Sequence, residues 1–597
     1  MITTRNKLAK LRAAMSDSGI TAYFVPSGDP HQSEYVPECW NRRAWLSGFD
    51  GSAGDVLVTS KRAGLWTDGR YHLQAAEDLK GTGITLFRAG EPGVESIEQH
   101  LGATLGPKDV LGVDPRVVTE SRMRSLATAL ESVGARLELV DKNLVDAIWA
   151  DQPALPRHPI TLWPDAFAGE TVRSKLRRVR KVMAEQGADA HLVTTLDAIA
   201  WLFNLRGTDV DFNPVAIAYA LVTHDSAELF IDARKVPPAV AAKLQRSVRI
   251  RPYGQILKAC RTLARAKQRV WIDPNSVNVW CIQALGASIR IRAPSPIGRM
   301  KAKKNTVELA GMRAAHHRDG IAMVRFLRWL EGAVAGGGQT EMSAATMLES
   351  FRAQGEHFRG LSFPTIAGYG PHGAIIHYRV DSSSDAPLQR KGLFLLDSGA
   401  QYLDGTTDIT RTVLLGKRAT RLEKDRYTRV LKGHIALATV RFPAGASGAR
   451  LDTLARVALW QAGLDYGHGT GHGVGAYLNV HEGPQSISFG RGLGEPLEPG
   501  NIQSNEPGYY EPGKFGIRIE NLVEVVEDPR ASRNGRPFLA FETLTLCPID
   551  TRLIEPTLLT SEERGWLNRY HARVLRELGS SLDPAERRWL RAACAKI

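Results

Sequence analysis

The sequence predicts a mixed α/β protein in which two similar α/β domains precede a larger, strand-rich carboxy-terminal domain. Short apolar strands such as VLVTS, AIAYALVT and AELFID alternate with helical segments in the first half of the chain, a pattern typical of α/β domains. Proline-rich passages interrupt it at 151–159 and 293–305. Because 597 residues exceed what one core usually supports, we expect domains at 1–155, 156–300 and 301–597, the last with an extension over about 535–597.

The two amino-terminal domains share a faint internal repeat. Each has a basic helical segment, then a short apolar strand, then a tryptophan-containing stretch. The strand and tryptophan segments read AYFVPSG with RAWLSGFDGS in the first domain and AHLVTTLDAIAWLFNLRGTD in the second. Self-similarity of this kind predicts two copies of one fold.

Composition and charge exclude several classes of function. The net charge of +14 raises nucleic-acid binding, but the densest basic stretch, Arg173 to Met183, has its apolar residues at helical spacing and no interleaved aromatics. The opening MITTRNKLAKLRAAM lacks the apolar segment of a secretory signal, and the longest apolar run, Val215 to Val222, is strand-sized. Five cysteines without CxxC spacing disfavour disulfides and thiolate zinc. We expect a cytoplasmic protein with no nucleic-acid or membrane partner.

The third domain is expected to open on a long amphipathic helix and then to change to strands. Apolar positions that include Val307, Met312 and Leu330 recur at helical spacing after Asn305. Strands and glycine-rich turns follow between residues 361 and 526, and a charged helical tail closes the chain. All motifs that suggest chemistry lie in the strand-rich part.

Two aspartates interrupt consecutive strands there. Asp397 closes the apolar run GLFLLD, and Asp408 lies in TTDITRTVLL, with GAQYLDG between them as the turn of a hairpin. A four-residue turn at 401–404 places the two aspartates opposite each other, and a two-residue turn at 404–405 offsets them by four positions. Either offset is even, so both carboxylates are expected on one face. A pair of turn-capping aspartates is the structural alternative.

Three further acidic or imidazole groups interrupt apolar sequence downstream. His472 lies in GHGTGHGVG, where glycines disfavour a helix and let the backbone approach a neighbour closely. Glu506 lies in SNEPGYY. Glu520 lies in FGIRIENLVEV, expected to be one strand with Arg518 and Glu520 on one face.

The inventory of four carboxylates and one imidazole favours a two-metal site. Two divalent cations balance its four negative charges, and mostly oxygen ligands suit manganese better than a structural zinc. Two ions that share a bridging hydroxide act as Lewis acid and nucleophile source, so hydrolysis is the leading chemistry. GHGVGA, from Gly471 to Ala476, matches a dinucleotide fingerprint but lacks a following helical segment, and no HExxH zinc motif is present.

These residues resemble a known family. The order DSGAQYLDGTTDITRT, GHGTGHGVG, LNVHEGPQ, SNEPGYYEPGKFGIRIEN is similar to the pita-bread metallopeptidases, specifically the cytosolic Xaa-Pro aminopeptidases (aminopeptidase P) of the long, three-domain type. The likeness extends to RRAWLSGFDGSAG, LWTDGRYHLQA, IAWLFNLRGTDVDFNP and TLTLCPIDTRLI, and so covers nearly the whole chain. It implies two creatinase-like amino-terminal domains followed by a pita-bread catalytic domain.

The resemblance also implies a role for each site residue. Two divalent ions are implied, usually manganese, with cobalt or zinc as alternatives. Their expected ligands are Asp397, Asp408, His472, Glu506 and Glu520. Asp408 and Glu520 are expected to bridge the ions. The residues expected around the substrate are His377, His468, His481 and the first-domain Arg70. Without this resemblance, the sequence around His377 indicates a core histidine, and His468 would be interpreted as a group that orients its neighbours.

The implied reaction releases the amino-terminal residue from short peptides whose second residue is proline. A hydroxide held between the ions attacks the scissile carbonyl, Glu506 takes the proton, and His481 or His377 stabilises the tetrahedral species. Arg518 is expected to hold a ligand carboxylate rather than to touch the substrate. A homodimer is implied. Two alternatives are a prolidase-like dipeptidase and an inactive pita-bread binding module, the latter predicting missing ligands.

Overall fold

The computed structural model describes residues 3–286, 288–490, 492–530 and 535–597 and comprises two compact units. One unit is formed by Met1–Asp165 and Glu170–Gly298, and the other by Ala166–Gly169 and Arg299–Ile597. In the described part of the chain, no helix is long and apolar enough to cross a membrane. All five cysteines are free thiols, as their spacing predicts.

The first unit contains two six-stranded sheets with the same topology. The first sheet is ordered β4-β3-β2-β1-β5-β6 and the second β12-β11-β10-β8-β13-β14. Their strands are β1 (Ala22–Val25), β2 (Asp55–Thr59), β3 (Ala63–Thr67), β4 (Thr85–Arg88), β5 (Val110–Val113), β6 (Arg136–Leu139), β8 (Ala190–Val193), β10 (Ala218–Thr223), β11 (Ala227–Ile231), β12 (Arg249–Pro252), β13 (Arg269–Ile272) and β14 (Ile289–Arg292). Two pairs are antiparallel in each sheet: β3 with β2 and β2 with β1 in the first, and β11 with β10 and β10 with β8 in the second. The other three pairs of each sheet are parallel. The faint repeat in the sequence is therefore a duplicated fold.

Helices cover the faces of these sheets with their apolar sides. The helix predicted from the basic stretch is α7 (Val172–Glu185), which buries Leu176, Val179 and Met183 and leaves most of its cations outside. Lys175 is the exception, since its buried ammonium donates to Trp201 O and Asn204 Oδ1 at 3.0 and 2.7 Å. The charge of this segment thus belongs mainly to a solvated helix face.

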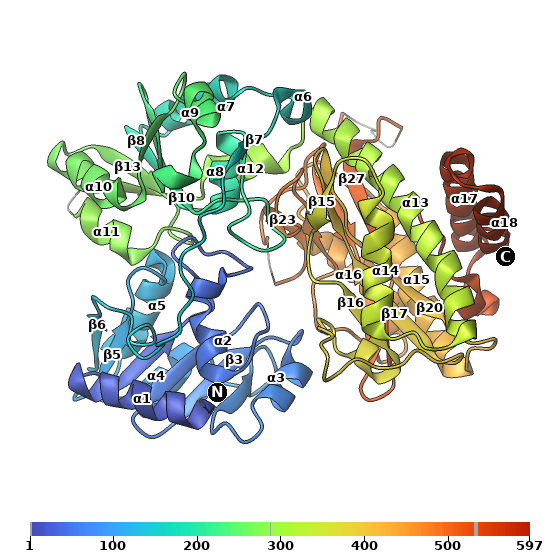
Figure 1. Ribbon diagram of the computed structural model, residues 1–597, viewed down its shortest axis with the longest axis horizontal. Coiled ribbons are helices and arrows are strands. Elements are labelled where there is room, and N and C mark those ends of the chain that lie inside the picture. The colour runs from blue at the N-terminus through green and yellow to red at the C-terminus, as the bar shows by residue number, and fades with distance from the viewer. Residues whose placement is uncertain (1–2, 287, 491, 531–534) are drawn as a thin grey trace. The chain divides into compact units, whose positions relative to one another are not determined.

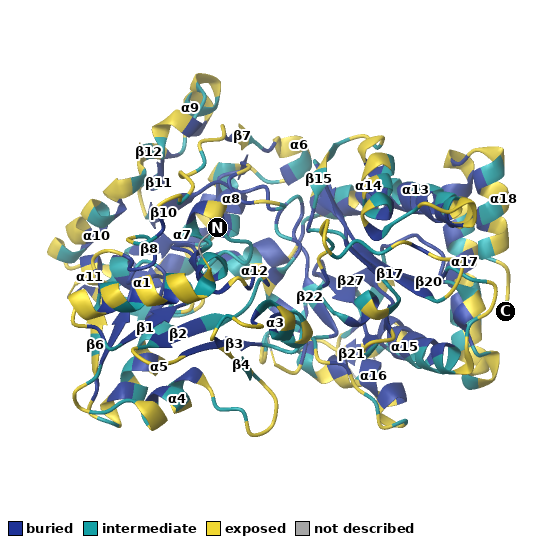
Figure 2. Cartoon of the chain, turned by 60° about the horizontal axis from the view of Figure 1, so that its bottom comes forward, coloured by how far each residue is buried: buried dark blue, intermediate teal, exposed yellow. Residues whose placement is uncertain are grey.

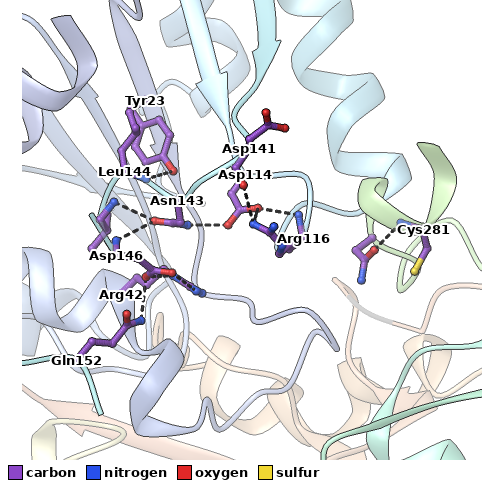
Figure 3. Close-up of polar contacts among 12 residues, drawn as sticks. Tyr23, Arg42, Asp114, Arg116, Asp141, Asn143, Leu144, Asp146, Gln152 and Cys281 are labelled. Atoms are coloured by element: carbon purple, nitrogen blue, oxygen red, sulfur yellow. Dashed lines mark hydrogen bonds and ion pairs between the residues drawn. The ribbon is translucent and has the colours of Figure 1, made fainter. Parts of the chain in front are cut away.

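Polar side chains hold the segment that follows β6 against the first sheet (Figure 3). Asn143 donates to Asp114 Oδ2 at 2.9 Å, and the amide of Leu144 donates to the hydroxyl of Tyr23 at 3.1 Å. Arg42 makes a bidentate pair with Asp146 at 2.6 and 2.8 Å. These contacts satisfy groups that the sheet would otherwise bury without partners.

The second unit layers helices against antiparallel sheets (Figure 1). The helices are α13 (Thr306–Gly336), α14 (Glu341–Ala353), α15 (Arg421–Thr439), α16 (Ala449–Trp460), α17 (Ser561–Leu578) and α18 (Pro584–Ala593). Its strands include β15 (Phe358–Leu361), β16 (Ile366–Tyr369), β17 (Leu393–Ser398), β18 (Ala400–Tyr402), β19 (Gly405–Thr406), β20 (Ile409–Leu414), β21 (Arg441–Pro443), β22 (Gly471–Gly473), β23 (Glu482–Ile487), β24 (Ile502–Asn505), β25 (Gly508–Glu511), β26 (Phe515–Arg518), β27 (Asn521–Glu527) and β28 (Phe538–Thr543). The sheets are ordered β16-β17-β20, β15-β18-β19, β21-β28-β27-β24-β22-β23 and β25-β26.

The long helix predicted after Asn305 is α13. Asn305 caps its amino terminus, because its side chain accepts from the amides of Val307 and Glu308 while the Glu308 carboxylate accepts from the amide of Asn305. Its apolar side, with Met323, packs with α14 onto the buried strands β17 and β20 (Figure 2). Val307 is exposed, so it does not belong to the buried stripe expected from the sequence.

The hairpin that carries the two aspartates has a register different from both predicted alternatives. Asp397 pairs with Thr410, so the residue opposite Asp397 lies two positions after Asp408. Tyr402 pairs with Gly405, so the turn is the two residues between them. Gly405 is a strand residue, and a Cβ there would lie 2.9 Å from the side chain of Ala315 in α13, so this strand position requires glycine. The offset is nevertheless even, so both carboxylates share a face.

Candidate functional site

The ends of several strands in the second unit bring the acidic residues together. Asp397 lies near the end of β17 and Asp408 directly precedes β20. His472 is the central residue of β22, and Glu506 follows β24. Glu520 lies between β26 and β27, where its amide donates to Thr410 O at 3.1 Å. The segment predicted as one strand is therefore two strands in different sheets, interrupted where the glutamate is presented.

Glycines on both sides of His472 allow neighbouring strands to approach it. A Cβ at Gly471 would lie 2.0 Å from Ser504 O, and one at Gly473 would lie 2.3 Å from Glu482 O. No side chain fits at either position, as the sequence pattern suggested. The strand β22, which carries His472, is therefore held closely between β23 and β24.

Three of the five predicted ligands converge on one point. The donor atoms of Asp408, His472 and Glu520 all lie within 4.8 Å of one another. The His472 Nε2 also lies 3.4 Å from Glu506 Oε1. Because Gly473 O, 2.9 Å away, accepts from the His472 Nδ1–H, the Nε2 lone pair faces the carboxylates. That tautomer is the one a metal ligand requires.

The donor set fits a cation. In the described part of the chain, Asp397 Oδ1, Asp408 Oδ1 and Glu520 Oε1 are buried without any hydrogen-bond donor. Burial and the neighbouring carboxylates raise the pKa of Asp408 and of Glu520 well above the usual range, and burial also raises the pKa of Glu506. These carboxylate oxygens are buried, lack hydrogen-bond donors and repel one another. A divalent ion bound among them would compensate their negative charge.

Arg518 partly compensates this charge. Its guanidinium donates to Asp397 Oδ2 at 2.6 Å and to Thr410 Oγ1 at 3.2 Å. The Thr410 hydroxyl in turn donates to Glu520 Oε2 at 2.8 Å. One buried cation therefore orients Asp397 directly and Glu520 through Thr410. That these carboxylates are metal ligands stays a prediction.

A directed series of hydrogen bonds connects Arg518 to His468. Arg518 Nη1 donates to the hydroxyl of Tyr510 at 2.6 Å, and that hydroxyl lies 2.8 Å from His468 Nε2. Gly469 O accepts from His468 Nδ1–H at 2.8 Å, so Nε2 accepts from Tyr510. Burial raises the pKa of Tyr510 to about 12, which keeps its proton in place at neutral pH. His468 thus orients Tyr510, the alternative role considered for it.

His481 stands beside the ligands and next to a buried ion cluster. Its ring packs edge-on to that of His472, with centroids 4.3 Å apart. The following residue, Glu482, is buried and accepts from Lys301 Nζ at 2.6 Å and from Lys304 Nζ. Both lysines come from the proline-rich segment that leads into this unit. They hold the start of β23, and with it the backbone of His481.

The other two predicted substrate residues lie on segments outside the strands that carry the ligands. His377 is half-buried in the segment after β16. Arg70 belongs to the first unit, where its guanidinium pairs with Asp68 at 2.8 and 2.7 Å. Their substrate contacts stay predictions.

Sequence reasoning missed several groups that build the site. Thr410, Lys301 and Lys304 contact ligand-bearing segments from more than a hundred residues away. Thr410 alternates with Asp408 along its strand, and that period-two spacing could have indicated it. No local signal marks the lysines, because their basic segment reads as an ordinary solvated linker.

The raised pKa values predict an unusual pH dependence for the metal-free protein. Carboxylates whose folded-state pKa exceeds the unfolded value bind more protons when folded, so stability falls as pH rises above about 4 towards neutrality. We expect the thermal midpoint of chelated, dialysed protein to be higher at pH 5.5 than at pH 7.5. Calorimetry with and without added divalent ion tests this, and a midpoint that rises with pH in the chelated sample would contradict it.

Family models match every part of this architecture. The Creatinase/Prolidase N-terminal domain matches residues 7–146 and again 151–308. Metallopeptidase family M24 matches residues 310–527, and the C-terminal region of peptidase M24 matches 537–597. The duplicated amino-terminal fold and the pita-bread metallopeptidase domain are thereby confirmed.

Relatives are similar along the whole chain. The probable Xaa-Pro aminopeptidase P of Aspergillus fumigatus is 44% identical over 612 aligned positions, which cover 100% of this chain and 93% of the relative. A crystal structure of X-prolyl aminopeptidase from Caenorhabditis elegans, described as a cytosolic enzyme with a di-nuclear active site, is 38% identical with a TM-score of 0.97 over 100% of both chains. The Xaa-Pro dipeptidase of Bacillus anthracis, 23% identical with a TM-score of 0.52, covers 64% of this chain and shares the fold alone. This chain therefore belongs to the Xaa-Pro aminopeptidase P family of M24 metallopeptidases.

Proposed function

We propose that this chain is a metal-dependent aminopeptidase that releases the amino-terminal residue from short peptides with proline at the second position. The observation that carries the proposal is the group of buried carboxylate oxygens without donors around the His472 imidazole. The full-length likeness to Xaa-Pro aminopeptidases supplies the substrate class. All five expected ligand residues are present, which disfavours an inactive binding module.

Two divalent cations would be held by Asp397, Asp408, His472, Glu506 and Glu520, with Asp408 and Glu520 shared between them. The di-nuclear active site described for the Caenorhabditis elegans enzyme supports this count. Manganese suits the mostly oxygen donor set, with cobalt or zinc as alternatives. When bound, such a pair supplies Lewis-acid polarisation and a nucleophile from water at neutral pH.

The chain's own residues would position the substrate and move protons. Glu506 is the proposed proton acceptor, and the Ser504 hydroxyl, which donates to its Oε1 at 3.0 Å, holds that oxygen in place. His481 or His377 would stabilise the developing tetrahedral species. His468, in addition to orienting Tyr510, and Arg70 of the first unit are proposed to contact the peptide.

Proline specificity follows from the chemistry of the scissile bond. An Xaa-Pro bond is a tertiary amide with no N–H, so an enzyme that recognises that donor cannot use it. The proposed site instead accommodates the pyrrolidine ring. A prolidase-like dipeptidase is the alternative, and it shares only the fold with part of this chain.

Removal and return of the metal tests the proposal. We expect hydrolysis of Arg-Pro-Pro to fall at least about 100-fold after chelation and to recover with manganese, because the cations supply the nucleophile. Release of arginine is measured by chromatography, with Arg-Ala-Ala as the control peptide. Failure of every divalent ion to restore activity would refute metal dependence. Cleavage of Arg-Pro in preference to Arg-Pro-Pro would favour the dipeptidase.

We further propose a cytoplasmic homodimer with domains at 1–155, 156–300 and 301–597. The description of the Caenorhabditis elegans enzyme as cytosolic supports the location. The two matches of the Creatinase/Prolidase model, which meet near residue 150, support the first boundary.

A further inference from the structure

A cavity of about 400 Å³ lies in the second unit, away from the carboxylate cluster. Its walls come from α13, the end of β20 with the residues that follow it, the segment at 548–552, and α18. Asp408 precedes β20, and Val413 lines the cavity near the other end of that strand. Five residues of extended chain separate them by about 17 Å. The cavity is thus a different site from the proposed metal centre.

Most of the residues that line the cavity are apolar. Leu330 and Val334 of α13, Val413 of β20 and Trp589 of α18 are among its lining residues. Figure 1 shows α18 beside α13, and both helices contribute apolar side chains to the same core. The volume lies within the range of small-molecule sites.

Five charged side chains also line the cavity, and their charges sum to +1: Glu331, Arg390, Lys417, Asp550 and Arg552. Both acids are already compensated. Arg552 pairs with Asp550 Oδ1 and Oδ2 at 2.9 and 2.7 Å and lies 3.5 Å from Glu331 Oε1. The Trp589 indole N–H donates to the other Glu331 oxygen at 2.8 Å.

The two remaining cations have no such partner. Within the described ranges, neither Arg390 nor Lys417 makes a side-chain hydrogen bond or an ion pair. They lie on adjacent segments, since a Cβ on Gly416 would be 3.1 Å from Arg390 O. The cavity therefore combines a largely apolar lining with two exposed, uncompensated cations on one wall.

We propose that this cavity binds a small amphipathic carboxylate. The apolar chain of the ligand lies against Val334, Val413 and Trp589, and its carboxylate is bound by Arg390 and Lys417, because a guanidinium and an ammonium are the strongest donors for it. The net charge of +1 is neutralised by a monoanion. A cation would be repelled, and a polyanion such as a nucleotide would leave its charge uncompensated against a largely apolar lining.

Decanoate is the probe that tests the proposal. By isothermal titration calorimetry on the full chain, below the micellar concentration, we expect decanoate to bind at least tenfold more tightly than decanol, with no binding of decyltrimethylammonium. No decanoate binding, or equal binding of the three compounds, would overturn the proposal.

Variants locate the binding. Arg390→Gln with Lys417→Gln is expected to weaken decanoate binding at least tenfold, while Arg418→Gln, a neighbouring cation outside the cavity, leaves it unchanged. Ala335→Trp, at an exposed lining position near the end of α13, fills the cavity and is expected to abolish binding without loss of helical circular dichroism. Unaltered binding in either cavity variant, or equal loss in Arg418→Gln, would refute the assigned site.

Discussion

Replacing Glu520 by glutamine is expected to lower kcat/KM by at least about 10³-fold and to remove at least one bound metal ion per chain. Glutamine keeps the shape of the side chain and an acceptor for the Thr410 hydroxyl. It removes one of the four negative charges that balance two divalent cations. Activity on Arg-Pro-Pro and metal content by mass spectrometry measure the two effects.

The same substitution is expected to stabilise the metal-free protein. Glu520 is 1% exposed, and the pKa of its carboxyl is raised first by burial and then by Asp408 and Glu506. Removing that charge relieves both penalties, so the thermal midpoint of the chelated variant rises, by about 2–4 °C for each kcal/mol relieved. Lower activity with a lower metal-free midpoint would indicate a folding defect and contradict the explanation.

Glu349→Gln is the matched control for Glu520→Gln. Glu349 is exposed on α14 in the same unit and lies outside the carboxylate cluster. Its replacement makes the same chemical change. It is expected to alter neither the metal content nor the thermal midpoint of the metal-loaded or the metal-free protein. A comparable loss of metal from this control would show that the charge of the unit, and not the cluster, governs metal binding.

Replacing Glu482 by glutamine is expected to destabilise the second unit by about 3–5 kcal/mol, because it leaves two buried ammonium groups without their anion. Lys301 and Lys304 are 3% and 4% exposed, and burial lowers the pKa of Lys304. Urea unfolding followed by tryptophan fluorescence measures the loss. The release of β23 is also expected to lower kcat, since the backbone of His481 adjoins it.

The pair formed by Arg299 and Glu495 provides the control for this prediction. Both ion pairs connect the proline-rich segment to the same unit, but the Arg299 side chain is 61% exposed, and it bonds Glu495 at 2.8 and 3.0 Å. An exposed pair contributes little, so Glu495→Gln is expected to change stability by less than about 0.5 kcal/mol. Equal losses in the two variants would refute the role of burial.

Much of the candidate site could be predicted from the sequence because carboxylates inside apolar strands are conspicuous. Asp397 and Asp408 were both recognisable, and both predicted turns have even offsets, which place the two carboxylates on one face. The register itself could not be predicted. Gly405, which is typical of a turn in sequence, lies in a strand where a Cβ would be only 2.9 Å from Ala315, a residue ninety positions earlier.

The sequence by itself determined the duplicated amino-terminal fold, the long helix after Asn305 and the inventory of acidic residues, because each depends on local periodicity and side-chain chemistry. Only the tertiary structure decided which carboxylate oxygens lack donors, that Arg518 orients Asp397 and Glu520, and that buried lysines hold Glu482. Those contacts join residues about a hundred or more positions apart. They depend on how sheets and helices pack, and no short stretch of sequence encodes that packing.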